Sequence, residues 1–298
     1  MIDQYHIERT LNLDRSFADD YNNVNTYPKF QEHLEKFKDH ITGLVDSNES
    51  KTFYKFGDGD YHFLKKSSIG SAKPGNRALS VSYEKLDHAQ FTDGVLLNDY
   101  YTCEIPHWYT KHFSEVISKP IDYPAEYGYG LVANIWFFKK FSGKIGVIGA
   151  SPKVDLIERL CQYEEYRDYL GCDGFVDYVR FPQKFACDDI DKTEELVSEQ
   201  LKKSTANIFL LGIGHAKSAI LHRFKKYTSA VFLDVGAGID AIAGCINVNR
   251  PYSGDWVNYR ISGYDYSKID YLRYTGAGKS KTLNWGEYNG TQRTMGFL

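Results

Sequence analysis

The sequence predicts an α/β fold in which helices flank a doubly wound, mostly parallel sheet of about six strands. Short apolar runs, such as residues 144–149, have the length of strands that are buried on both faces. Stretches with helical spacing of apolar residues, such as 30–44, alternate with these runs. This alternation is what a parallel sheet with crossover helices requires.

The expected strands are marked in different ways. Residues 144–149 are almost entirely apolar, whereas residues 53–56 are mainly aromatic and end at Gly57. We expect strands at 53–56, 94–98, 144–149, 175–181, 207–213 and 230–235.

Apolar spacing and capping residues predict the helices. Ser151 followed by Pro152 is typical of a helix start, and Asp191 with Glu194 resembles a capping box. Gly171 is expected beyond the end of the helix that starts at Ser151, because glycine commonly ends helices. We expect helices at 30–44, from Ser82 to about Phe91, at 107–117, at 125–141, from Ser151 to a stop before Gly171, from Asp191 through Leu201, and at 215–226.

Three segments are expected along the 298 residues. Residues 1–50 hold a polar arm and the first helix, and residues 51–250 form the α/β domain. Residues 251–298 are polar and rich in tyrosine and glycine, so we expect them to wrap over the core as a tail.

Composition limits the classes of function. The formal net charge of −3 gives no general attraction to nucleic acid or to anionic membranes. The five cysteines lie far apart without a C-x-x-C pair, which favours a reducing compartment. The N-terminus lacks a secretion signal, and no run approaches the roughly 18 apolar residues of a membrane span. We therefore expect a cytoplasmic protein with no transmembrane segment and no nucleic-acid polymer as partner.

Two carboxylates follow the first expected strand, in the run Gly57-Asp58-Gly59-Asp60. Carboxylates this close repel each other, and a hard cation such as Mn²⁺ or Mg²⁺ relieves the repulsion. Such a cation can bridge protein carboxylates to a diphosphate. The pattern predicts Asp58 and Asp60 as metal ligands, although it also suits an ordinary polar turn between a strand and a helix.

Further loops are expected at the same edge, because the carboxyl ends of parallel strands meet there. The segment from Gly212 through Gly214 turns a strand into a helix, whose first N–H groups can face an anion. His215 follows and can contact a phosphate, act as a base, or serve only in capping and packing. The loop from Asp234 to Gly238 ends another expected strand.

That last loop allows a different function. Residues 231–238 resemble the first motif of methyltransferases that use S-adenosylmethionine. In those proteins many strands follow the motif, whereas only 60 residues follow Gly238 here, and Asp240 stands where the last glycine belongs. Methyl transfer is therefore an alternative, and a non-catalytic nucleotide- or glycan-binding protein is another.

The run Lys55-Phe56-Gly57-Asp58-Gly59-Asp60 resembles the early Arg-x-Gly-Asp-Gly-Glu motif of the GT-D glycosyltransferases, a bacterial family with a Rossmann-like sheet and a metal-linked D-x-E motif. The likeness extends loosely to the turn at Gly212 and to the strand that ends at Asp234-Val235-Gly236. Lys55 replaces arginine, so the positive charge stays but the planar fork is lost. Asp60 replaces glutamate and has a shorter reach.

The resemblance implies transfer of a sugar from a nucleotide-sugar, expected to be a UDP-sugar, to a glycan or a glycosylated protein. In this hypothesis Asp58 and Asp60 hold Mn²⁺ or Mg²⁺, and His215 or Asp234 is the candidate base. Lys55 and the amides near Gly214 add positive potential around the diphosphate. The expected donor-binding residues are Lys55, Gly57, Gly59, Gly212, Gly214, Asp234 and Gly236.

Overall fold

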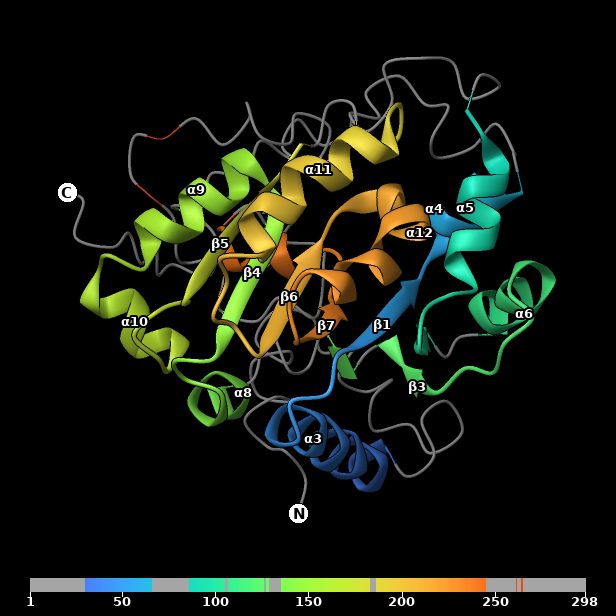
Figure 1. Ribbon diagram of the computed structural model, residues 1–298. Coiled ribbons are helices and arrows are strands. Elements are labelled where there is room, and N and C mark those ends of the chain that lie inside the picture. The colour runs from blue at the N-terminus through green and yellow to red at the C-terminus, as the bar shows by residue number, and fades with distance from the viewer. Residues whose placement is uncertain are drawn as a thin grey trace.

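One sheet of seven parallel strands forms the centre of the protein (Figure 1). The computed structural model describes residues 30–65, 86–104, 107–125, 127–128, 135–182, 186–244, 261 and 264. The strand order is β3-β2-β1-β7-β6-β4-β5, and every pairing is parallel. The predicted doubly wound, Rossmann-like α/β fold is confirmed. The strands are β1 (Lys51–Phe56), β2 (Tyr100–Cys103), β3 (Tyr123–Pro124), β4 (Ile145–Ala150), β5 (Asp177–Phe181), β6 (Ile208–Gly212) and β7 (Val231–Asp234).

Helices cover both faces of the sheet and bury a separate hydrophobic cluster on each face. One face carries α3 (Phe30–Asp46), α8 (Ile135–Lys140), α9 (Ser151–Leu160), α10 (Glu164–Leu170) and α13 (Gly238–Ile242). The other carries α4 (Asp58–Leu64), α5 (His88–Val95), α6 (His107–Val116), α11 (Ile190–Leu201), α12 (Lys217–Ile220) and the 3₁₀ segment η3 (Leu221–Lys226). A short 3₁₀ turn, η2 (Gly214–Ala216), precedes α12.

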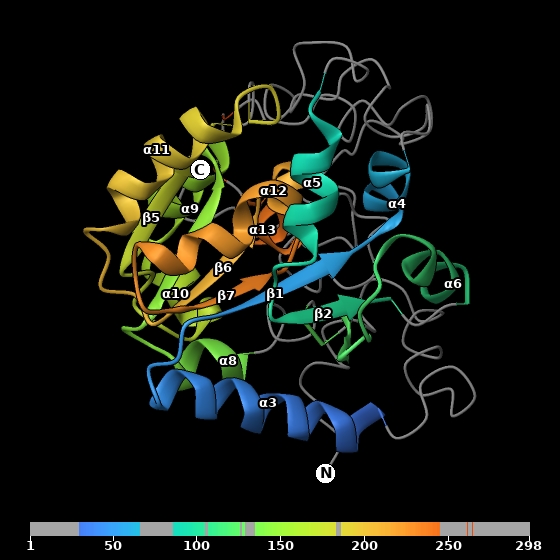
Figure 2. The same ribbon diagram turned by 45° about the vertical axis from the view of Figure 1, so that its right-hand side comes forward.

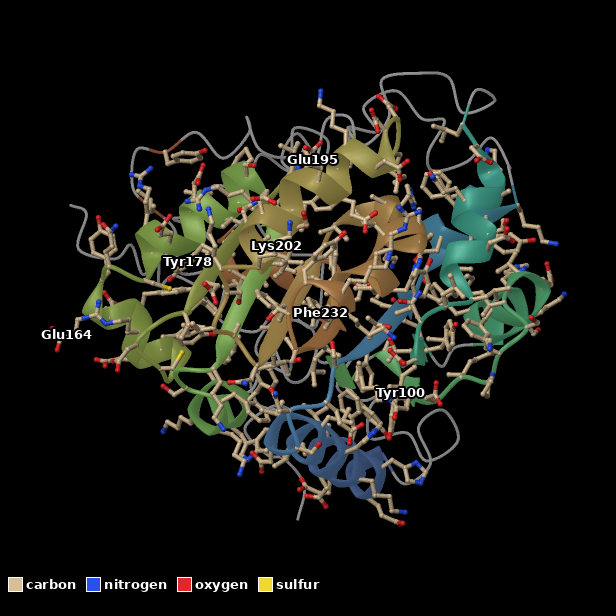
Figure 3. All side chains as sticks on the ribbon, in the orientation of Figure 1. Tyr100, Glu164, Tyr178, Glu195, Lys202 and Phe232 are labelled. Atoms are coloured by element: carbon tan, nitrogen blue, oxygen red, sulfur yellow. The ribbon has the colours of Figure 1, made fainter. Side chains whose placement is uncertain are left out.

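Most side chains of the central sheet are buried, whereas side chains on the outer surface of the helices are exposed. Phe232 of β7 lies in the middle of the sheet, whereas Glu195 and Lys202 lie on the outer side near α11 (Figure 3). Within the described ranges, no helix has both the length and the apolar character that crossing a membrane would require.

The helices that follow β1, β7 and β6 do not lie on the same face. Helix α4 continues from β1 and α12 follows β6, and both pack into the same hydrophobic cluster (Figures 1 and 2). Strand β7 lies between these two strands, but α13 that follows it packs into the cluster on the opposite face. In open parallel sheets, ligands bind at the carboxyl ends of strands where the connections diverge in this way. The topology therefore places the expected ligand site at the carboxyl end of β7.

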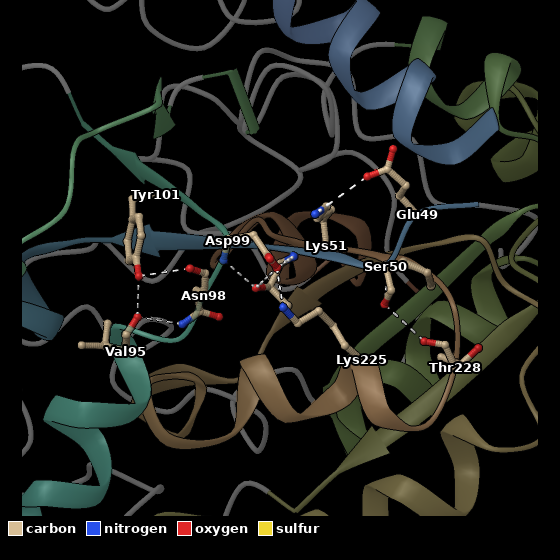
Figure 4. A network of polar contacts seen from close by, with 11 residues as sticks. Glu49, Ser50, Lys51, Val95, Asn98, Asp99, Tyr101, Lys225 and Thr228 are labelled. Carbon is tan, nitrogen blue, oxygen red and sulfur yellow. Dashed lines mark hydrogen bonds and ion pairs between the residues drawn. The ribbon is translucent and has the colours of Figure 1, made fainter. Parts of the chain in front are cut away.

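The opposite, amino edge of the sheet is held by a polar network around Asp99 (Figure 4). The Asp99 carboxylate accepts hydrogen bonds from the Thr52 backbone N–H at 2.8 Å and from the Thr52 hydroxyl at 3.0 Å. Lys225 of η3 donates to the same Asp99 oxygen at 2.7 Å. The network joins β1, the start of β2 and η3, and so fixes the register of β1 against β2.

The prediction of a strand at residues 94–98 is wrong. Gly94 lies in α5, where an added Cβ would be 2.5 Å from the Ser218 carbonyl oxygen. Glycine therefore lets α5 pack closely on α12, as Figure 2 shows. The side chain of Asn98 ends this segment by donating to the Val95 carbonyl at 3.0 Å. The second strand is β2 at Tyr100–Cys103, and neither it nor the two-residue edge strand β3 was predicted.

Several helix bounds also differ from prediction. The segment that starts at Ser151 forms two helices, α9 and α10, and Gly171 ends the second with a left-handed φ of 82°. Asp189, two residues before Asp191, is the N-cap of α11 and accepts from the Lys192 N–H at 2.9 Å. Residues 215–226 form no continuous α-helix, because 3₁₀ turns flank the single α-helical turn of α12. Residues 1–27, the expected helix start at Ser82 and most of 251–298 lie outside the described residues.

Candidate functional site

The carboxyl ends of β1, β6 and β7 bring the predicted loops together. Strand β1 pairs with β7, and β7 pairs with β6 up to Asp234. Lys55, Gly57 and Asp60 therefore lie beside Asp234 and Gly236, with the turn at Gly212 and Gly214 on the other side of β7. The structure places all of the described site residues at this edge: Lys55, Gly57, Gly59, Asp60, Gly212, Gly214, His215, Asp234 and Gly236.

Lys217, which the sequence analysis did not assign to the site, lies at its centre. The Lys217 ammonium is 3.0 Å from Asp60 Oδ2 and 2.8 Å from Asp234 Oδ2. It also donates to the carbonyl oxygen of Lys55. These three oxygens match the three donors of an ammonium group. The aromatic ring of Tyr54 lies below the ammonium, with 4.7 Å from Nζ to the ring centroid.

Asp234 acts as a structural acceptor at the end of β7. Its Oδ2 accepts from the Lys55 backbone N–H at 3.2 Å, and its Oδ1 accepts from the Gly236 N–H at 2.9 Å. With Lys217 as a third donor, this carboxylate is buried and has three hydrogen-bonding partners. Asp234 thus joins β1, β7 and α12, and of the two predicted bases only His215 keeps an accessible ring.

Asp60 belongs to the same charge cluster from the side of α4. Its Oδ2 accepts from the Gly57 N–H at 2.9 Å, as in a capping box, and from Lys217. Burial by itself raises the pKa of Asp60, but Lys217, His215 and Lys55 outweigh burial and lower this pKa far below its ordinary value of 3.8. Asp60 is therefore an anion at neutral pH.

His215 is held in place by α4. Its ring stacks on Phe63 with 4.6 Å between centroids and 10° between planes. An added Cβ on Gly59 would lie 3.0 Å from His215 Cε1, so glycine at this position makes room for the ring. His215 Nδ1 is 3.7 Å from Asp60 Oδ1, which is an electrostatic contact longer than a hydrogen bond. With Nδ1 turned toward Asp60, Nε2 is the ring nitrogen that can meet a ligand.

The Lys55 side chain lies at the carboxyl ends of β1 and β7. Its ammonium is 3.6 Å from Glu104 Oε1. It lies close to two turns, because a Cβ added at Gly57 would be 3.3 Å from Lys55 Nζ and one at Gly236 would be 3.9 Å away. Lys55 therefore places an ammonium, which is paired with Glu104, between the end of β1 and the end of β7.

The glycines of the site have different physical roles. Gly212 is needed for packing, because its Cβ would be 2.4 Å from the Gly236 carbonyl oxygen. Gly214 and Gly236 have left-handed φ values of 60° and 50°, which favour glycine. Among the described residues, no atom lies within 4 Å of a Cβ added at Gly214. The backbone at Gly214 thus faces open space at the sheet edge.

Among the described residues, the surroundings of Asp60 Oδ2 do not fit a metal ion. Lys217 and the Gly57 N–H already contact Asp60 Oδ2, so a cationic partner occupies the position a metal would need. Across the ranges that the structure describes, no group of three or more His, Cys, Asp and Glu side chains could hold a metal. The side chain of Asp58 lies outside the described residues, so its part in a Mn²⁺ or Mg²⁺ site stays a prediction.

An ion pair and a cavity involve residues that were not predicted as site residues. A second buried ion pair joins Lys153, in the first turn of α9, to Asp240 of α13 at 2.6 Å. A polar cavity of about 540 Å³ lies at the amino edge of the sheet, far along the strands from Lys217 and Asp234. Its lining residues are Lys139, Ser142, Glu164, Arg167, Asp168, Gly171, Cys172 and Asp173.

Comparisons with protein-family models, curated proteins and solved structures found no match. The resemblance to GT-D glycosyltransferases therefore rests on the residues of the first motif and stays a prediction. The geometry at the carboxyl edge of the sheet carries the functional argument.

Proposed function

We propose that the protein transfers a sugar from a nucleotide-sugar to a glycan or glycosylated acceptor at the carboxyl ends of β1, β6 and β7. One observation carries the proposal. Lys55 and His215 flank two left-handed glycine turns, at Gly214 and Gly236, beside the point where the helix connections diverge. A nucleoside diphosphate requires positive charge and close approach of its phosphates to the backbone, and this edge supplies both.

The proposed reaction assigns one task to each ligand-facing side chain. Lys55 contacts the diphosphate and offsets the negative charge that grows on the leaving group. The acceptor hydroxyl attacks the anomeric carbon, the bond from this carbon to the diphosphate oxygen breaks, and the nucleoside diphosphate leaves. His215 Nε2 takes the hydroxyl proton, and the nearby Asp60 carboxylate stabilises the imidazolium that forms.

The choice of sugar transfer over other nucleotide chemistry comes from the likeness of residues 55–60 to the glycosyltransferase motif. The motif also implies Mn²⁺ or Mg²⁺ at Asp58 and Asp60, but the Lys217 ammonium already lies against Asp60 Oδ2, and no step of the proposed reaction depends on a metal. Methyl transfer through the loop from Asp234 to Gly238 is tested beside sugar transfer. In the structure, the Asp234 carboxylate of that loop already has three donors.

A thermal-shift panel tests the proposal with UDP-, GDP- and dTDP-sugars, each with and without Mn²⁺, and with S-adenosylmethionine as a separate arm. Lys55→Met is the test variant. Lys51→Met is its control, because Lys51 lies on the same face of β1 but roughly 13 Å away at the amino end.

We expect one class of nucleotide-sugar to raise the midpoint of the wild type and of Lys51→Met. Its affinity for Lys55→Met should fall about 10- to 100-fold, since a charge-assisted contact is lost. Equal affinity for the two variants would reject the assigned site, and stabilisation by S-adenosylmethionine alone would favour methyl transfer.

A further inference from the structure

We propose that Lys217 is a cation built into the site, whose ammonium takes the position that a divalent ion would need between Asp60 and Asp234, so that neither carboxylate ligates a metal. The position of the Lys217 ammonium does not depend on which sugar donor binds. The role of this ammonium in catalysis rests on the proposed function.

The surroundings of the Lys217 ammonium have the chemistry of a hard-cation site. Two carboxylate oxygens, from Asp60 and Asp234, and the backbone carbonyl oxygen of Lys55 surround Nζ. Carboxylate and carbonyl oxygens are the ligands that Mg²⁺, Mn²⁺ and Ca²⁺ prefer in proteins. The ring of Tyr54 forms the floor of this cradle, and its hydroxyl is 2.8 Å from Ser218 Oγ. An ammonium group therefore fills a cradle whose oxygens would otherwise attract a metal ion.

The cradle holds one cation and no more. Lys217 is buried, as are Asp60 and Asp234, so the ammonium cannot swing into solvent without leaving two carboxylates unpaired. A divalent ion beside the ammonium would meet strong repulsion at this short range. The positions along the chain also fit, because Lys217 begins α12 directly after the turn at Gly214. The charge is thus present at the sheet edge before any ligand arrives.

The inference predicts what happens when the ammonium is removed. Lys217→Ala leaves the three oxygens around an empty position and should create a divalent-cation site. Lys153→Ala is the matched control, because it breaks a second buried ion pair at this edge, the one between Lys153 and Asp240. Lys217→Ala combined with Asp60→Asn removes one ligand from the new site.

Melting temperatures in MnCl₂ and in chelator are measured for each variant without any nucleotide. We expect Mn²⁺ to raise the midpoint of Lys217→Ala by roughly 5 °C, relative to its effect on the wild type, at about 100 times the dissociation constant. The Lys153→Ala variant and the Lys217→Ala/Asp60→Asn double variant should lack this gain. A folded Lys217→Ala that gains no response to Mn²⁺ would overturn the inference.

A second measurement decides the case if Lys217→Ala does not fold. Mn²⁺ binding is titrated into the wild type and Asp60→Asn, both with Lys217 present. Equal binding by the two proteins, or none by either, supports the inference. Loss of binding in Asp60→Asn overturns it, because Asp60 would then be a ligand. Neither measurement uses a sugar donor, so a negative nucleotide-sugar panel would reject the proposed function and leave this inference standing.

Discussion

Asp60 and Lys217 should stabilise the fold as a coupled pair, and a double-mutant cycle measures the coupling. Asp60→Asn replaces a carboxylate that accepts from Gly57 and Lys217 with a neutral amide, which should cost about 3 kcal/mol. Lys217→Met leaves two buried carboxylates whose Oδ2 atoms lie 3.0 and 2.8 Å from the former Nζ position. The two oxygens are therefore at most about 5.8 Å apart, and at that distance the repulsion between the two carboxylates is about 3 kcal/mol for an effective dielectric constant of 20. Together with the lost hydrogen bonds, Lys217→Met should cost about 5 kcal/mol.

The double variant removes the repulsion between Asp60 and Asp234, so its cost should also be about 5 kcal/mol. The sum of the two single costs is then about 3 kcal/mol larger than the cost of the double variant. Urea unfolding at pH 7, followed by far-ultraviolet circular dichroism, measures the free energy of unfolding of the four proteins. Costs that add to within about 0.5 kcal/mol would show that the two side chains are not coupled and would refute the reasoning.

Three further changes test separate parts of the structure. Gly59→Val should displace His215 and lower turnover at least ~10-fold. Gly43→Ala is the control and should not lower turnover, because no atom of the described structure lies within 4 Å of its added Cβ. Equal turnover in the two variants would contradict the role of Gly59. Asp99→Asn should cost about 2 kcal/mol of unfolding free energy without changing nucleotide affinity, and a change in affinity would show that the two edges communicate. Burial, with nearby positive charges, lowers the pKa of His222 from 6.5 to about 4, so the unfolded chain takes up a proton first and stability falls as the pH drops from 6.5 toward 4. In His222→Gln that fall should be smaller when melting temperature is measured against pH, and an unchanged profile would refute the shift.

The predicted ranges overlap β1, β4, β5, β6 and β7, and the clearest sequence signals come from the strands that are apolar on both faces. Strands β4, β6 and β7 are continuous apolar runs, and their predicted ranges contain or nearly match the observed ones. The strand predicted at 94–98 was wrong because Gly94-Val95-Leu96-Leu97 has strand composition, whereas Asp87 caps the start of α5 and Asn98 caps its end. The edge strand β3 has only two residues, which is too short for any periodicity.

The candidate site was predictable only where a local motif marks it. Glycine next to a carboxylate, as in residues 57–60, signals a functional turn within a few residues of sequence. Lys217 carries no such signal, because its role depends on Asp60 and Asp234, which only the folded sheet brings to the same ammonium. The one local hint is a lysine two residues after His215, at the start of a helix that follows a strand.

Release of nucleoside diphosphate from the nucleotide-sugar selected by the thermal-shift panel tests the central claim most directly. Initial rates are compared for the wild type, Lys55→Met and Lys51→Met at equal fractions of folded protein. The proposal predicts release by the wild type and by Lys51→Met at similar rates, with a loss of at least ~10-fold in Lys55→Met. Equal rates in all three proteins would contradict the assigned site, and binding without any release would contradict transfer itself.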